Sequence, residues 1–375
     1  MSKQVKMVIK ELRGKLGITQ KELATLLNVS FQTISKWENG INLPDIIYLP
    51  KMAEIFDVST DVLLGLKPLT DEEQWRKFDD SSYWSNNRKR TRLWKELYWN
   101  EDYFSFLVRE VWNINHPVDI LDYGCGYGFL GMKLLPLLPE GSTYTGIDMD
   151  GDLIKEAYEF FDKTSYRTSF INEDVYKYKP EKKYDIVISL YLMSYLQNPD
   201  LILQKMKASL TDNGTIILID VNMEVEQAGY YSGLEREEGG MERPDFTPVW
   251  KSERSHKERD YRMGTKLAYM LKEIGMKEIK MRISDKVIIY DSEDEENREL
   301  KDIFRYVYEH NDSYTKGHSY FTSRGISYSE AEKYVEYYNK TEQYFNSDNS
   351  MAVKTAGLYF AWGKMKGKEK NEGTK

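Results

Sequence analysis

A glycine-rich loop behind an apolar strand constrains this chain more than any other feature of its sequence. The segment VDILDYGCGYGFLG, from Val118 to Gly131, places Gly124, Gly126 and Gly128 directly after an apolar run. Glycine has no Cβ and tolerates positive φ, so such a loop lets the backbone approach a ligand closely. The pattern therefore predicts a buried strand that runs into a ligand-binding loop.

The acid at the end of this strand, Asp122, separates two kinds of ligand. Dinucleotide sites use the pattern G-x-G-x-x-G, with which Gly126, Gly128 and Gly131 can be aligned, and bind a pyrophosphate that a carboxylate would repel. S-adenosylmethionine (SAM) carries a sulfonium and an ammonium instead, so the acid favours SAM over NAD. The stretch D-x-G-x-G-x-G resembles the first motif of the class I SAM-dependent methyltransferases.

Two further acids follow the next predicted strands. STYTGID ends in Asp148, about twenty residues beyond the loop, where doubly wound folds place an acid that binds the ribose of either cofactor. In the resembling family, the position of Asp174 and Val175 holds the adenine, and the position of Leu190 and Tyr191 lines the pocket. The resemblance thus implies a set of cofactor-binding residues: Asp122, Gly124, Cys125, Gly126, Gly128, Asp148, Met149, Asp174, Val175, Leu190 and Tyr191.

Each of these segments, taken alone, also fits an ordinary buried strand of an α/β protein. Such strands are short apolar runs, and acids are common at their ends. Their agreement in order favours a Rossmann-like α/β methyltransferase domain, which we expect over residues 81–368.

Residues 1–67 show a different pattern, that of five short helices. Thr19 precedes QKELATLL and has Glu22 three residues after it, which is the arrangement of a capping box. Ser30 is placed to cap the next helix, FQTISKWEN. We therefore expect an all-α N-terminal domain with a tight turn between its second and third helices.

The stretch from ITQKELATLLNVSFQTISKWENGINLPD to DVLLG resembles the Cro/repressor helix-turn-helix family. The resemblance implies that the third helix enters the major groove of DNA and that the protein binds as a homodimer. It also implies base contacts by Phe31, Gln32, Thr33 and Lys36, and phosphate contacts by Gln20 and Ser30. A helical bundle that serves only dimerisation is the alternative.

Charge is distributed unevenly between these two parts of the chain. Residues 1–67 contain 9 basic and 7 acidic residues, and the whole chain has a formal net charge of −8. An acidic body argues against a large polyanionic substrate for the methyltransferase domain, whereas a net charge of +2 is weak for a part that binds DNA.

The N-terminus lacks the pattern of a signal peptide, and no run of about 18 apolar residues occurs. The single cysteine, Cys125, excludes an internal disulfide. We expect a cytoplasmic protein without a metal site.

The remaining segments are less regular. Residues 68–80 are polar and predict a linker, and residues 369–375 predict a disordered tail. The short basic run Arg88, Lys89, Arg90 and Arg92 is interpreted mostly as a solvated helix face. Two long inserts, at about 223–263 and 284–350, are expected to form a substrate cap, because long excursions from a compact domain are usually functional or disordered.

The catalytic residues are the least defined part of the sequence. His256, Tyr195 and His318 are weak candidates for a base, and each is also compatible with a packing or surface role. DNA methylation is disfavoured, because the only cysteine lies in the glycine loop and SLYLMSYL replaces the Asn/Asp-Pro-Pro-aromatic motif of DNA amino-methyltransferases. Two functions remain open: a small-molecule methyltransferase fused to a DNA-binding module, and a non-catalytic transcription factor that senses SAM or S-adenosylhomocysteine.

Overall fold

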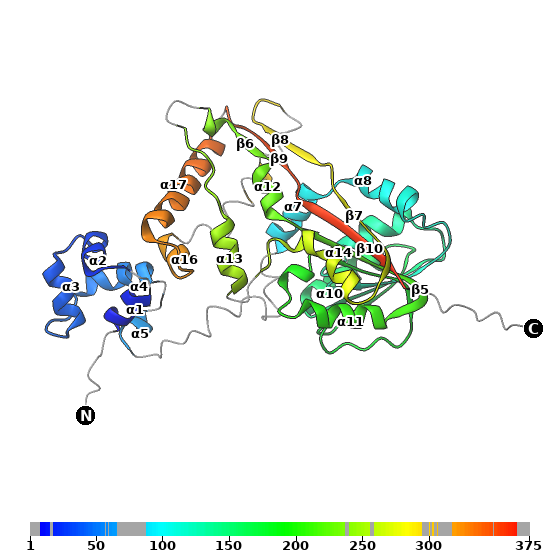
Figure 1. Cartoon of the computed structure of the whole chain (residues 1–375), viewed down its shortest axis with the longest axis horizontal. Helices are drawn as coiled ribbons and strands as arrows, with labels where there is room; N and C mark the ends of the chain where they lie inside the picture. The colour runs from blue at the N-terminus through cyan, green and yellow to red at the C-terminus, as the bar shows by residue number, and fades with distance from the viewer. Residues whose placement is uncertain are drawn as a thin grey trace, which may run out of the picture. The chain divides into compact units, whose positions relative to one another are not determined.

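The computed structural model describes residues 8–15, 18–56, 58, 60–65, 88–236, 240–255, 259–294, 300, 302–303, 306, 317–347 and 349–365 (Figure 1). The chain divides into two compact units, which we describe separately. The first comprises residues 1–75, 233–256 and 305–350, and the second comprises residues 76–232, 257–304 and 351–375. The predicted linker at 68–80 and tail at 369–375 lie outside the described residues.

The first unit is helical. Its elements are α1 (Ile9–Lys15), α2 (Gln20–Leu27), α3 (Phe31–Glu38), the 3-10 turn η1 (Ile46–Tyr48), α4 (Leu49–Phe56), α5 (Thr60–Leu63), η5 (Gly233–Glu235), α13 (Thr247–Ser255), α16 (His318–Thr322) and α17 (Tyr328–Phe345). The predicted capping box is present, since Thr19 and Glu22 each accept a backbone N–H from the other. Ser30 caps α3 in the same way, by accepting the N–H of Thr33.

The two inserts are divided between the compact units, and their expected role as a substrate cap stays a prediction. Residues 233–256 and 305–350 belong to the same compact unit as the N-terminal helices. Within it α16 contacts α4, and Tyr328 packs against the core formed by α1 to α5. The physical reason is aromatic packing, because Phe246 lies 5.0 Å from the ring of Tyr334, which in turn stacks on Phe321. Among the described residues of these segments, Tyr320, Tyr334, Tyr337 and Tyr344 are buried in helical cores.

The second unit is an α/β fold. Its helical elements are α7 (Arg88–Tyr98), α8 (Glu101–Phe106), the π-helical turn η2 (Leu107–Val111), α9 (Phe129–Leu134), η3 (Leu135–Leu137), α10 (Gly151–Phe161), η4 (Met193–Tyr195), α11 (Pro199–Ala208), α12 (Met223–Ala228) and α14 (Met263–Glu273). Its strands are β1 (Asp119–Tyr123), β2 (Thr143–Asp148), β3 (Arg167–Asn172), β4 (Tyr184–Leu190), β5 (Leu210–Val221), β6 (Tyr230–Ser232), β7 (Lys277–Ile283), β8 (Val287–Asp291), β9 (Met351–Thr355) and β10 (Leu358–Lys364).

The main sheet has the strand order β3-β2-β1-β4-β5-β10-β7. Its first five strands are parallel, and β10 runs antiparallel between β5 and β7. A small second sheet has the order β6-β9-β8. In the main sheet the order of the parallel strands reverses between β1 and β4, and doubly wound folds bind their ligands in the crevice at that point.

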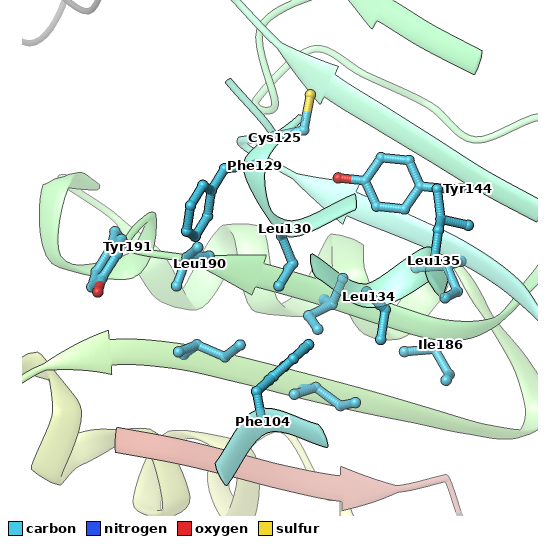
Figure 2. Close-up of a cluster of buried hydrophobic side chains, with 14 of the residues drawn as sticks. Phe104, Cys125, Phe129, Leu130, Leu134, Leu135, Tyr144, Ile186, Leu190 and Tyr191 are labelled. Carbon is cyan, nitrogen blue, oxygen red and sulfur yellow. The ribbon is translucent and has the colours of Figure 1, made fainter. Parts of the chain in front are cut away.

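Helices cover both faces of the main sheet. One apolar cluster joins α8, α9 and α10 to the sheet, and Figure 2 shows Leu130 and Leu134 of α9 among side chains that include Ile186 and Leu190 of β4. A second cluster joins α11 and α14 to the other face. The result is a Rossmann-like α/β architecture, as expected from the sequence, with central strands buried on both sides. Among the described residues, no helix is long and apolar enough to cross a membrane.

Candidate functional site

A cavity of about 420 Å³ lies at the carboxyl ends of β1, β2, β3 and β4. Its lining combines the glycine loop, the acids that follow β2 and β3, the end of β4 and one helix face. The cofactor-binding residues predicted from the sequence that line it are Gly124, Gly126, Asp148, Met149, Asp174, Val175, Leu190 and Tyr191. The topology of the sheet therefore gathers at one place residues that are up to 67 positions apart in the chain.

The glycines of the loop divide into two roles. Gly124 and Gly126 have positive φ (75° and 55°) and line the cavity. A Cβ on Gly126 would meet nothing nearer than 3.8 Å, whereas a Cβ on Gly128 would lie 2.8 Å from Cε2 of Phe161. Gly128, predicted to bind the cofactor, is absent from the cavity wall. It instead lets the start of α9 pack closely against Phe161 of α10.

Asp148 fixes the loop from the neighbouring strand. Its Oδ2 accepts the backbone N–H of Gly126 at 2.8 Å, and its Oδ1 accepts that of Asp150 at 2.9 Å. The N–H groups of Gly124 and Cys125 both donate to the carbonyl of Ile147. Desolvation raises the pKa of the Asp148 carboxyl, and the two backbone donors lower it. The loop is thus held rigidly beside an acid that faces the cavity.

Two other predicted residues, Asp122 and Cys125, do not line the cavity. Asp122 is buried beneath the loop and accepts a hydrogen bond from the hydroxyl of Tyr144, while burial raises the pKa of its carboxyl to about 7. Burial also raises the pKa of the Cys125 thiol well above its usual range. Both side chains lie outside the cavity lining, so their direct contact with a cofactor stays a prediction.

One face of α7 completes the cavity wall, and the sequence analysis missed it. Arg88, Thr91, Trp94 and Lys95 all line the cavity and recur at helical spacing. Lys95 places a cation close to the loop, because its Nζ would lie 4.0 Å from a Cβ on Gly126. Burial lowers the pKa of Lys95, and the nearby carboxylates of Asp122 and Asp148 raise it. The helical period of RKRTRLWKELY was the available signal, and Arg88 is not merely a solvated residue.

Tyr191, just beyond β4, has an unusual backbone conformation. Its φ is 58°, which is rare for a bulky residue and is often held in place at binding sites. Its hydroxyl is buried and has no hydrogen-bond partner within the described parts of the chain. Burial keeps the pKa of this hydroxyl well above its usual range, so it can donate a hydrogen bond into the cavity.

The three candidates for a base have different outcomes. Tyr195 lines the cavity. His318 belongs to the first unit, where its ring stacks on that of Tyr328 with 4.5 Å between centroids, and burial lowers its pKa. It is not among the residues that line the cavity, and its neighbour Tyr328 packs against the N-terminal helical core. His256 lies outside the described residues.

The residues predicted to contact DNA lie at the start of α2 and along α3. Gln32 and Lys36 are exposed, and the ring of Phe31 is 48% exposed. Thr33 is half-buried, and its hydroxyl lies 2.8 Å from that of Ser30. On the opposite face of α3, Ile34 and Trp37 are buried in the core, as expected. The helix therefore presents a mixed polar and aromatic surface to solvent.

Gln20 takes part in a network that the sequence did not suggest. Its Nε2 donates to Oε2 of Glu38 at 2.7 Å, and Oε1 of Glu38 forms an ion pair with Arg13. A second nitrogen of Arg13 donates to the carbonyl of Ile18. This network ties α1 and α3 to the start of α2, so Gln20 has a structural role besides its predicted phosphate contact.

Family models match both parts of the chain. The Helix-turn-helix model matches residues 9–63, and the Methyltransferase domain model matches residues 114–275. The chain joins a helix-turn-helix domain to a methyltransferase domain. The matches agree with the all-α first part and with the sheet whose glycine loop lines the cavity.

Relatives resemble the two domains separately. The helix-turn-helix domain is 44% identical over 57 residues to the HTH-type transcriptional regulator ImmR of Bacillus subtilis (strain 168), covering 15% of this chain and 45% of that protein. The methyltransferase domain is 31% identical over 99 residues to malonyl-[acyl-carrier protein] O-methyltransferase 2 of Ilyobacter polytropus, covering 26% of this chain and 38% of that protein. The chain thus spans less than half of the length of either relative.

Solved structures resemble the methyltransferase domain more distantly. A putative methyltransferase from Bacillus halodurans has 14% sequence identity and a TM-score of 0.40, covering 67% of this chain and 94% of that one. A likeness at this level supports no assignment, so the domain assignments rest on the family models and curated relatives.

Proposed function

We propose that the methyltransferase domain binds SAM and transfers its methyl group to a small-molecule acceptor. The observation that carries this proposal is the cavity at the switch point of the sheet, lined by Gly124, Gly126 and Asp148. A glycine loop fixed to an acid of the next strand is suited to a nucleoside, because the backbone can approach closely while the carboxylate accepts hydroxyl groups.

The residues present fit SAM well. Asp148 and Asp174 offer carboxylates for a ribose and an adenine amine, and Lys95 offers a cation for a carboxylate. Tyr191 provides a buried hydroxyl without a partner in the described residues. When bound, SAM supplies a methyl group on a positively charged sulfur, and its loss to a nucleophile leaves S-adenosylhomocysteine. The protein holds the acceptor in line with that methyl group, and such positioning accounts for much of the rate.

A small acceptor is favoured over DNA as the substrate. The buried Cys125 has a raised pKa, so it is a poor nucleophile for attack on a cytosine. The cavity wall is aromatic where Trp94 of α7 meets Tyr191, just beyond β4, and Tyr195 adds a third ring to it. Aromatic walls suit small organic molecules. Of the two candidate bases that the structure describes, Tyr195 lines this cavity and His318 does not.

The helix-turn-helix domain is proposed to bind DNA as a homodimer and so to make the protein a transcriptional regulator. Gln32 and Lys36 are exposed on α3 for base contacts. Large apolar side chains are also exposed between α3 and α4, namely Ile41, Leu43, Ile46 and Ile47, each more than 60%. Grouped exposed apolar residues favour a protein interface. A mass in solution of one chain, measured by sedimentation equilibrium, would contradict the dimer.

A second function is a SAM or S-adenosylhomocysteine sensor without catalysis. One observation favours it: the chain passes repeatedly between the two units, since residues 233–256 and 305–350 fold with the helix-turn-helix domain. The domain that we propose to bind SAM is therefore connected to the DNA-binding unit through several covalent links. Such links can transmit a ligand-dependent change if the two ligands differ in affinity between two states.

The deciding experiment is transfer of labelled methyl from SAM into a metabolite extract of the source cell. Wild type is compared with Gly126→Arg, whose side chain would fill the cavity at a position with positive φ. We expect labelling of a small molecule by wild type alone. If wild type binds SAM and labels nothing, the enzyme hypothesis fails and the sensor remains.

A further inference from the structure

Tyr191, the residue that directly follows β4, has two features that each cost free energy in a folded protein (Figure 2). Its φ of 58° lies in the left-handed region, which is unfavourable for a bulky side chain. The residue is only 7% exposed, and its hydroxyl has no hydrogen-bond partner among the described residues. Buried polar groups are nearly always hydrogen-bonded, so this hydroxyl at a cavity wall indicates a partner that a ligand supplies.

The hydroxyl lies on the side of the cavity away from the two acids that suit a nucleoside. In the main sheet, β2 and β3, which lead to Asp148 and Asp174, lie on one side of β1, and β4 lies on the other. Neighbouring strands are about 4.8 Å apart, so the ends of β2 and β4 are separated by roughly 10 Å. The backbone N–H of Tyr191 donates to a carbonyl of β5, and the carboxylates that act electrostatically on its hydroxyl belong to Asp220 and Glu226. Tyr191 therefore faces the part of the cavity that remains for a molecule beside SAM.

The ring of Tyr191 belongs to a fixed aromatic wall. Its centroid lies 4.9 Å from that of Trp94, in an edge-to-face arrangement, and both residues line the cavity. The ring of Trp94 is in turn stacked on that of Tyr98, with 4.3 Å between the centroids. A flat conjugated molecule can add a further ring contact of the same kind to this wall.

The Tyr191 hydroxyl is a hydrogen-bond donor. Burial and the nearby carboxylate of Asp220 both raise the pKa of this phenol well above its usual range. The hydroxyl therefore keeps its proton at neutral pH, where it is unsuited to act as a base but able to donate to an oxygen atom.

We propose that Tyr191 selects the methyl acceptor, by donating a hydrogen bond from its hydroxyl to an oxygen atom of a flat, conjugated molecule that lies against Trp94. Carbonyl and phenolic oxygens on an aromatic ring have this chemistry. The inference rests on the proposed methyltransferase function and names the class of its acceptor. In this arrangement SAM is held by Asp148, Asp174 and Lys95, and the Tyr191 hydroxyl serves the acceptor.

Two matched probes test the class of acceptor. Acetophenone carries a carbonyl oxygen on an aromatic ring, and ethylbenzene is its counterpart without oxygen. The binding of each probe to the S-adenosylhomocysteine complex of the full-length protein is titrated by saturation-transfer NMR. The ratio of the two affinities should favour acetophenone about tenfold more in wild type than in Tyr191→Phe, because ethylbenzene leaves the hydroxyl unpaired. If neither probe binds wild type, or if the ratio is the same in both proteins, the inference is wrong.

Kinetic constants separate the acceptor from the cofactor. With tritium-labelled SAM and dilutions of the metabolite extract, Tyr191→Phe should raise the KM for the acceptor about tenfold and change the KM for SAM by less than about twofold. A rise in the KM for SAM alone would assign the hydroxyl to the cofactor and overturn the inference. Tyr269→Phe makes the same chemical change at an exposed residue of α14 that does not line the cavity, and it should match wild type.

Stability distinguishes this role from a structural one. Because the hydroxyl has no partner within the described residues, Tyr191→Phe should unfold at the midpoint temperature of wild type or at a higher one. A lower midpoint would show that the protein itself satisfies the hydroxyl, and would overturn the inference. Calorimetric affinity for S-adenosylhomocysteine should be equal in both proteins. If wild type does not bind S-adenosylhomocysteine, the proposed function fails, whereas normal binding with an unchanged ratio for the probes rejects this inference alone.

Discussion

The backbone N–H of Gly126 donates to Oδ2 of Asp148 over 2.8 Å, which joins the glycine loop after β1 to the end of β2. The other oxygen of Asp148 accepts the N–H of Asp150. One carboxylate therefore shapes the loop and also faces the cavity.

Replacing this carboxylate should affect both stability and ligand binding. Asp148→Ala leaves two partly buried N–H groups without their acceptor, which costs about 1–3 kcal/mol for each group that finds no water. We expect a lower unfolding midpoint and an affinity for S-adenosylhomocysteine reduced at least thirtyfold by calorimetry. Asp152→Ala is the matched control, because Asp152 is exposed at the start of α10 and does not line the cavity. Equal binding by both variants would contradict the assignment.

Lys95 is expected to contribute to SAM binding through its charge. Lys95→Met keeps the length of the side chain but removes the cation that lines the cavity. We predict an affinity for S-adenosylhomocysteine about tenfold lower, which corresponds to about 1.4 kcal/mol. Lys89→Met, on the exposed face of the same helix, should bind like wild type. A normal affinity in Lys95→Met would show that this lysine only packs against the rings of Tyr127 and Phe129.

The two roles of the loop glycines can be separated by alanine substitutions. Gly128→Ala combines positive φ with a 2.8 Å approach to Phe161, and overpacking of this kind typically costs about 1–3 kcal/mol. Gly126→Ala shares the positive φ but has open space around the new Cβ. The midpoint temperature of thermal unfolding should therefore be lowered more by Gly128→Ala than by Gly126→Ala. If the two variants lose the same stability, close packing at Gly128 is not the reason for glycine there.

The raised pKa of Asp122 predicts a pH-dependent stability. Its folded pKa of about 7, against an ordinary value of 3.8, means that the folded state holds a proton that the unfolded chain has released between these values. The contribution of this carboxyl to the free energy of unfolding is fully present below pH 4 and is lost as the pH rises through about 7. Asp122→Asn should therefore gain stability relative to wild type between about pH 5 and pH 8. The measurement is urea unfolding, followed in the transition whose midpoint shifts when S-adenosylhomocysteine is added.

Asp119, at the other end of β1, provides the opposite control for this experiment. Hydrogen bonds from Thr143 and Lys182 lower the pKa of its carboxyl despite the desolvation that raises it. Asp119→Asn should therefore be less stable than wild type at neutral pH, and the difference should shrink as the pH falls. The same trend in both variants would contradict the charge assignments.

Substitutions of exposed residues on α3 are predicted to abolish the selection of a DNA sequence. Gln32→Ala combined with Lys36→Ala removes two exposed groups from the helix expected in the major groove, and each good base contact is typically worth about 1–3 kcal/mol. Selection of a palindromic site from a random DNA library should be abolished. Glu11→Ala, exposed on α1, should select the same site as wild type. Unchanged selection by the double variant would refute the assignment.

The sequence by itself determined the two domain types and the part of the cavity wall at the ends of the strands. Capping residues such as Thr19 and Ser30 act within one turn of helix, and the glycine loop acts within one strand-loop junction, so local patterns record them. The ordered acids Asp148 and Asp174 were also predictable, because parallel strands bring their carboxyl ends to one edge.

Only the tertiary structure decided which of these residues face the cavity and which support it. Asp122 and Gly128 belong to the same motif as Gly126, yet contacts with Tyr144 and Phe161 turn them to packing roles. Lys95 reaches the cavity from a helix outside the motif, and the insert helices pack with the N-terminal domain. Such contacts depend on how distant elements meet in space, and the spacing of residues along the chain does not encode them.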